Sequence, residues 1–151
     1  DIVVTATGFN LSVFGDVVFT VDGEPVDFTQ HLTWRGVMIS GLPNMAYTFG
    51  YFRHSWTLRV DLVSDLVGRL LTNMQDKGAT MVVPTLRPQD RDMQLRQWSD
   101  PDNFNSGYVM RSQHIMFKQG DREPWTHMLE HDEEREILPK ADLDDGTLVY
   151  R

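Results

Sequence analysis

The sequence predicts an α/β fold with short strands, one long helix and an irregular α+β tail, on three observations. Short apolar runs, typical of buried strands, recur through residues 2–49. An apolar side chain then recurs every fourth residue from Leu58 to Met74, which predicts an amphipathic helix. Beyond Gly78 the chain becomes polar and rich in turn residues. We therefore divide the chain into residues 1–78 and a C-terminal extension, residues 79–151, that packs on them.

The first strands are predicted near the N-terminus. Residues 2–6 are an almost continuous apolar run that stops before Gly8, the pattern of a strand buried on both faces. Residues 17–21 predict a second strand and residues 26–28 its return, because the Asp-Gly pair at 22–23 is a tight-turn signal.

Two further strands are predicted at residues 37–40 and 45–49, the second ending at Gly50. Strands of this apolar kind need cover on both faces, which one helix cannot supply. Parallel neighbours also need crossover connections of a dozen or more residues. We therefore expect this chain to be a piece of a larger sheet.

The long helix is the clearest element in the sequence. Ser55 is its expected N-cap, and Gly78 its expected stop. The expected buried positions are Leu58, Leu62, Leu66, Leu70 and Met74, and the expected solvent-facing positions are Arg59, Asp65, Arg69 and Asn73. Charged residues within this stretch exclude a membrane span.

The tail predicts three short elements. Residues 81–83 read as an edge strand, residues 125–137 as a helix that ends before Pro139, and residues 147–150 as a final strand.

Composition excludes several classes of function. The 151-residue chain has a formal net charge of −8 and no cysteine. An acidic chain matches neither a nucleic-acid backbone nor an anionic membrane surface, so we expect neither as a partner. The lack of cysteine excludes a disulfide framework and a thiolate site. With no charged-then-apolar leader, we expect a cytoplasmic protein without a transmembrane segment.

One motif suggests a metal site. His127, Glu130 and His131 spell H-x-x-E-H, which can bind zinc on one helix face with the glutamate as general base. A third ligand is needed, and the nearby candidates are Glu134 and Glu136. We favour a solvated polar helix that binds no metal, with a zinc hydrolase as an alternative. A stand-alone acidic interaction domain without a cofactor is a further alternative.

Several short motifs follow one another in a fixed order. ATG at 6–8 ends the first apolar run, GLPNM at 41–45 precedes a later one, and SWTL at 55–58 opens the long helix. The tail adds GYVMR at 107–111, KQG at 118–120 and PW at 124–125. In this order the motifs resemble the C-terminal part of the class B flavoprotein monooxygenases, the Baeyer–Villiger and flavin-containing monooxygenase family, and in particular its mycobacterial ethionamide-activating type.

This resemblance implies that the chain is the C-terminal part of a Rossmann-like FAD-binding domain with an extension. The whole enzyme would use FAD, NADPH and O₂ to insert one oxygen into a ketone or onto a sulfur or nitrogen atom. The sequence contains no G-x-G triplet, so the phosphate-binding loops are expected upstream in the same polypeptide. We expect this chain alone to be inactive, to hold no FAD or NADP, and to carry no catalytic residue.

The resemblance also implies a site at the start of the long helix. Its N-terminus would face the flavin, whose reduced form is negative near N1 and O2, while a helix N-terminus offers free N–H groups and about half a positive charge. The residues expected to bind the cofactor are Gly8, Gly50, Thr57, Leu58 and Asp61. The residues expected to line the substrate pocket are Trp56, Leu58, Phe52 and His54. The alternatives are an ordinary packed helix and, for Trp56, a core aromatic residue.

Overall fold

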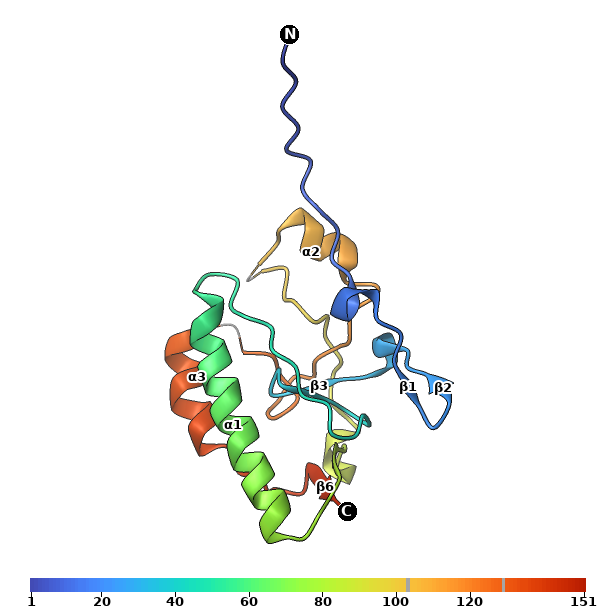
Figure 1. Ribbon diagram of the computed structural model, residues 1–151, viewed down its shortest axis with the longest axis vertical. Helices are drawn as coiled ribbons and strands as arrows, with labels where there is room; N and C mark the ends of the chain where they lie inside the picture. Colours follow the sequence, from blue (N-terminus) through green and yellow to red (C-terminus); the bar gives the residue numbers. More distant parts are fainter. Residues whose placement is uncertain (103, 129) are drawn as a thin grey trace.

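The computed structural model describes residues 1–102, 104–128 and 130–151 and has a mixed α/β fold (Figure 1). Its helices are α1 (Trp56–Asp76), α2 (Gly107–Ser112) and α3 (His131–Ile137). Its strands are β1 (Thr20–Val21), β2 (Glu24–Pro25), β3 (Thr33–Trp34), β4 (Met38–Ile39), β5 (Val82–Pro84) and β6 (Leu148–Tyr150). Short 3-10 turns lie at Val13–Asp16, Phe28–Gln30, Pro88–Asp90 and Leu138–Lys140.

The strands form antiparallel pairs rather than one sheet. Within the described residues β1 pairs with β2, β3 with β4, and β5 with β6. The last pair joins Val83 to Val149 and confirms the strands predicted near both ends of the tail. The other small pairs hold only two residues per strand, so packing rather than strand pairing organises the molecule.

The predicted buried strand at residues 2–6 is wrong for this chain. Residues 1–10 have no regular structure, and Ile2, Val3 and Val4 are 92%, 86% and 85% exposed. Figure 1 shows this run extending away from the rest of the molecule. A strand forms where a neighbour pairs with its N–H and C=O groups, and no described strand lies beside it.

Other strand predictions are shortened or wrong. The hairpin turn is confirmed, since Asp22 and Gly23 both have positive φ as a tight hairpin requires. The strands around it are shorter than predicted, because β2 ends at Pro25 and Phe28 begins a 3-10 turn. Residues 45–49 form no strand and make only a single antiparallel bridge, between Ala46 and Met38.

The long helix is confirmed and organises the larger core. α1 buries Val63, Leu66, Leu70 and Met74 against β3, β4, β5 and the C-terminal tail. This core joins residues from both halves of the chain. None of the described helices is long and apolar enough to cross a membrane.

The solvent-facing position predicted for Arg59 is wrong. Arg59 lies one turn before Val63 on the buried stripe, and its side chain is 0% exposed. The predicted helix at 125–137 is also wrong in its first half: residues 125–128 and 130 lie outside any helix, α3 begins at His131, and Trp125 is a fully buried core residue. Residue 129 lies outside the described residues.

A second core, rich in aromatic residues, lies beside the start of α1. Its buried members are Phe28, Ile39, Leu42, Trp98, Val109, Met116 and Phe117. Phe49 and Phe52, just before α1, pack against it.

Candidate functional site

The start of α1 presents free backbone N–H groups. No side chain caps this end: the Ser55 hydroxyl lies 2.8 Å from the Thr57 hydroxyl and accepts no bond from the helix amides. The first turn contains no acidic residue. Because the first N–H groups of a helix have no partner inside it, this end carries an uncompensated positive partial charge.

Gly50 makes room for the indole of Trp56. A Cβ added at Gly50 would lie 2.2 Å from Cγ of Trp56, closer than any side chain permits. Gly50 does not have the positive φ of a glycine turn. This close approach therefore explains the glycine and fixes the indole against the loop that precedes α1.

Trp56 forms one wall of an apolar cavity, which we call the aromatic pocket. The cavity has a volume of about 260 Å³ and is also lined by Phe14, Tyr47, Phe49, Trp98 and Phe117. Trp56 is 51% exposed, and its ring centroid lies 4.8 Å from that of Phe49. Trp56 thus lies half-exposed in a cavity wall, and its role in contacting a substrate stays a prediction.

Phe52 and His54 lie on different sides of this region. Phe52 stacks on Phe104 with a centroid distance of 4.1 Å and meets the edge of Trp98, so it supports the aromatic core. The Nε2 atom of His54 lies 3.3 Å from a carboxylate oxygen of Glu130, so this side chain turns toward the segment before α3.

The residues predicted to bind the cofactor lie in two separate places. Thr57, Leu58 and Asp61 are exposed in the first two turns of α1, on a surface free for a ligand or another part of a protein. Gly8 lies instead in the N-terminal run, next to Phe9, whose ring packs on Tyr108 of α2. No interaction among the described residues joins Gly8 to α1.

A buried ion pair holds the start of α1 in place. Arg59 donates to both carboxylate oxygens of Glu134 in α3, with the shortest distance 2.8 Å from Nη2 to Oε1. The two side chains are 0% and 1% exposed. The Tyr51 hydroxyl donates to Glu134 at 2.5 Å, and burial together with this bond raises the pKa of Tyr51.

Arg59 also binds the backbone around the site. Its guanidinium donates to the carbonyl oxygens of Gly36 at 3.0 Å, Phe49 at 2.7 Å and Arg35 at 3.2 Å. All five N–H groups of the guanidinium can therefore be satisfied. One side chain thus links α1, α3 and the loop that carries Gly50.

The H-x-x-E-H residues do not form a helix face. His131 is the first residue of α3, but His127 lies before it and is only 6% exposed, so a solvated polar helix is the wrong interpretation for His127. Its ring stacks on Trp98 at 5.5 Å. Burial and the charge of Arg59 hold the pKa of His127 well below its ordinary value. Within the described ranges, no group of three or more His, Asp or Glu side chains is placed to hold a metal.

Sequence reasoning missed the residues that shape this region from a distance. Trp98 lies in a polar, turn-rich stretch where no periodicity marks it as buried. Glu134 lies in an acidic run that reads as solvated. The one available signal was Arg59, which lies four residues before Val63, at helical spacing from the apolar stripe.

Comparisons with known proteins show which proteins this chain is similar to. No protein-family model and no solved structure matches the chain. It is 43% identical over 150 residues to the FAD-containing monooxygenase EthA of Mycobacterium tuberculosis, covering 99% of this chain and 30% of that protein. It is 37% identical over 150 residues to the probable FAD-binding monooxygenase AlmA of Acinetobacter baylyi, covering 99% of this chain and 29% of that protein.

A third relative has a similar name and a similar level of identity. The putative FAD-containing monooxygenase MymA of Mycobacterium tuberculosis is 37% identical over 150 residues, with 99% of this chain and 30% of that protein covered. The chain therefore spans about 30% of the length of the curated relatives it matches. The resemblance to the flavoprotein monooxygenases is confirmed: over almost its whole length the chain is similar to part of these FAD-containing monooxygenases.

Proposed function

We propose that this chain is the C-terminal portion of an FAD- and NADPH-dependent monooxygenase that inserts one oxygen from O₂ into a ketone or onto a sulfur or nitrogen atom. In this proposal residues 1–78 complete a Rossmann-like FAD-binding domain, and residues 79–151 pack on it. Support comes from the relatives, which are named as FAD-containing or FAD-binding monooxygenases.

The observation that carries the proposal is the uncapped start of α1. Its first N–H groups have no side-chain cap, its first turn has no acidic residue, and the neighbouring Trp56 and Leu58 are exposed. This donor set suits the edge of a flavin ring, which carries negative charge when reduced. A bound FAD would supply hydride acceptance and oxygen activation.

In this proposal the residues of this chain would orient the flavin and enclose the substrate. The amides of Thr57 and Leu58 would donate toward the flavin, and the α1 dipole would stabilise its negative charge. The indole of Trp56, held by Gly50 and Phe49, would limit which substrates approach. We assign no proton-transfer role to any of these residues.

The remaining cofactor contacts are assigned to the rest of the polypeptide. The chain has no G-x-G triplet to cradle a pyrophosphate, and its relatives are about three times longer. The exposed apolar run at residues 2–6 would gain its strand partners there. Gly8, at the end of this run, would approach the cofactor only in that larger sheet.

Introducing a negative charge at the start of α1 tests the flavin contact. In the full polypeptide, Thr57→Asp should lower the flavin midpoint potential, because the carboxylate opposes the negative charge of the reduced ring. A charge pair at this range is worth roughly 1–3 kcal/mol, or about 20–60 mV for a two-electron couple. The potential is measured by equilibrium dye titration.

Thr72→Asp is the matched control, because Thr72 is also exposed on α1. It lies fifteen residues further along, roughly 22 Å away at the helical rise. Its potential should stay at the wild-type value. An equal shift in both variants, or none in Thr57→Asp, would show that the start of α1 does not face the flavin.

A stand-alone acidic domain is the second candidate, favoured by the net charge of −8. The visible spectrum of the purified full polypeptide separates the two: bound flavin absorbs, whereas a domain of this second kind is colourless.

A further inference from the structure

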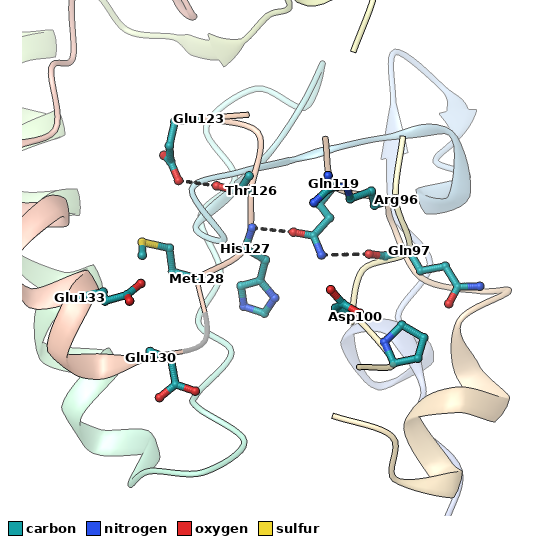
Figure 2. A pocket seen from close by; sticks show the side chains of 11 residues that line it. Arg96, Gln97, Asp100, Gln119, Glu123, Thr126, His127, Met128, Glu130 and Glu133 are labelled. Carbon is teal, nitrogen blue, oxygen red and sulfur yellow. Dashed lines mark hydrogen bonds between the residues drawn. The ribbon is translucent and has the colours of Figure 1, made fainter. Parts of the chain in front are cut away.

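The chain contains a second cavity, which we call the acidic cleft, with a volume of about 600 Å³. Its walls come from residues of the segments 96–101, 123–128 and 130–133, and Gln119 joins them (Figure 2). It is a different cavity from the aromatic pocket, although Trp98 stands close to both.

The two walls are fixed by one buried side chain. Gln119 accepts a hydrogen bond from the backbone N–H of His127 at 3.0 Å and donates to the carbonyl oxygens of Gln97 at 3.0 Å and Trp98 at 3.1 Å. Because Gln119 is 9% exposed, these bonds are shielded from water. The cleft is therefore a formed cavity between two tied segments.

His127 lacks the partners that a buried imidazole requires. It is 6% exposed, and neither of its ring nitrogens makes a hydrogen bond of good geometry among the described residues. The Trp98 carbonyl lies near enough to the ring to act on the pKa of His127, but a carbonyl can accept only from the ring N–H, so the acceptor nitrogen has no donor. Figure 2 shows the ring between the two walls of the cleft. Buried polar atoms are nearly always hydrogen-bonded, so the acceptor nitrogen of this ring indicates a missing donor. A neutral imidazole offers one acceptor nitrogen, and the lowered pKa of His127 keeps it neutral near pH 7.

Two of the carboxylates in the cleft already have cationic partners. Glu123 lies 3.0 Å from the guanidinium of Arg35. Glu130 lies 3.3 Å from His54 and 3.9 Å from Arg53. These two carboxylates therefore contribute little free charge.

The other two carboxylates in the cleft remain available. Asp100 and Glu133 make no ion pair within the part of the chain that the structure describes, and Arg96 is the one cation among the described lining residues. One carboxylate oxygen of Asp100 accepts a hydrogen bond from the backbone N–H of Asp102 at 2.9 Å, which leaves the other oxygen for a ligand. The available charge is thus negative. Since no described group of His, Asp and Glu is placed for a metal, the charge favours an organic cation.

We propose that the acidic cleft binds a small organic cation with N–H donors, a primary ammonium or a guanidinium, which donates to His127 and pairs with Asp100 and Glu133. The site is separate from the proposed flavin contact and does not depend on it.

Titration calorimetry of the full polypeptide with n-butylammonium chloride tests the site. We expect saturable binding with one cation per chain. Tetramethylammonium has the same charge but no N–H donor, and n-butanol has a donor but no charge, so both should bind at least about tenfold more weakly, as for a lost hydrogen bond to a charged group.

Variants locate the binding. Glu133→Gln should weaken n-butylammonium binding by about 2–5-fold, the range of an exposed ion pair. Asp132→Asn makes the same charge change one residue away, outside the cleft, and should leave binding unchanged. His127→Phe keeps a ring against Trp98 and should weaken binding by about tenfold or more. If that variant does not fold, Asp100→Asn replaces it, with an expected loss of about 2–5-fold.

Far-UV circular dichroism of each variant serves as the check on folding, so loss of cation binding with the wild-type spectrum concerns the cleft alone. The proposal is overturned if n-butylammonium shows no saturable binding, or if Asp132→Asn weakens it as much as Glu133→Gln. It is equally overturned if a crystal structure of the full polypeptide places one of its own lysine or arginine side chains against Glu133.

Discussion

At the residue scale, single side chains around the start of α1 decide the shape of the candidate site. Gly50 and Trp56 act as one unit, because the indole occupies the space that a side chain at position 50 would need. The pair places an aromatic wall directly beside the free N–H groups of the helix.

Gly50→Ala should therefore destabilise the protein. The added methyl group would force the Trp56 ring to move, and overpacking of this kind costs about 1–3 kcal/mol. Gly68→Ala is the matched control in the middle of α1, where a Cβ meets no atom within 4 Å. It should stabilise by about 0.5–1 kcal/mol. Urea unfolding measures both, and a neutral Gly50→Ala would show that the ring has room to spare.

Trp56→Ala should change substrate preference more than stability. In the full enzyme the ratio of kcat/KM for bulky and small substrates should shift by about 1–3 kcal/mol, because a pocket wall is removed. The half-exposed indole should cost less stability than the roughly 3–5 kcal/mol of a buried one. Leu71→Ala, an exposed truncation further along α1, should leave the ratio unchanged. An unstable Trp56→Ala with unaltered preference would assign the indole to packing alone.

His127 gives the protein a specific pH dependence. Its pKa is lowered well below 6.5, so between 6.5 and the folded value the unfolded chain binds a proton that the folded chain does not. The free energy of unfolding should therefore fall as pH drops below 6.5, by up to about 1.4 kcal/mol per pH unit. His127→Phe should lose this part of the slope in unfolding measured between neutral and mildly acidic pH. An identical slope in both proteins would show that His127 takes up its proton in the folded state.

At the scale of elements, the buried pair of Arg59 and Glu134 connects α1 to α3. The pair replaces the apolar contact that the helical stripe would otherwise make at this position. Through its bonds to the Phe49 and Gly36 carbonyls, Arg59 also fixes the loop before α1.

Arg59→Met should destabilise the fold by about 3–5 kcal/mol, since it leaves the Glu134 carboxylate buried without its partner. The double variant with Glu134→Leu should recover a large part of this loss, because no charge stays buried. Arg135→Met is the control: its pair with Asp132, 3.7 Å apart, is exposed and worth at most about 1 kcal/mol. Denaturation of the wild type, Arg59→Met, Glu134→Leu and the double variant measures the coupling, and a double variant as unstable as the sum of the two single variants would contradict the argument.

At the scale of the whole molecule, the chain forms its own hydrophobic cores, but apolar side chains at its N-terminus and at the start of α1 are exposed to solvent. The apolar run at 2–6 and the first turns of α1 are exposed, and the chain spans about 30% of its relatives. We therefore expect the cofactor to be held mainly by residues outside this chain.

The 151-residue chain by itself should retain no FAD. It offers helix amides to one edge of the ring but no glycine-rich loop for the pyrophosphate. The chain is mixed with FAD, dialysed, and its visible spectrum recorded, with the full polypeptide as the positive control. Stoichiometric flavin in the dialysed chain would contradict the expectation.

The sequence by itself determined the elements whose cause is local. α1 follows from its apolar spacing, the hairpin turn from Asp22 and Gly23, and the relationship to flavoprotein monooxygenases from motifs at fixed order. The tertiary structure decided what depends on distant partners. Residues 2–6 have the composition of a strand yet form none, because strand pairing needs a neighbour that this chain does not supply.

Dependence on distant partners also explains why some buried residues were predicted at the surface. The polarity of Arg59 and Glu134 places each at the surface when it is considered alone, and only their meeting across 75 positions makes burial of both charges tolerable. Trp98 and His127 likewise become buried only where their segments meet over Gln119. Local pattern fixes helices and turns, whereas the burial of a polar group depends on a partner that sequence spacing does not reveal.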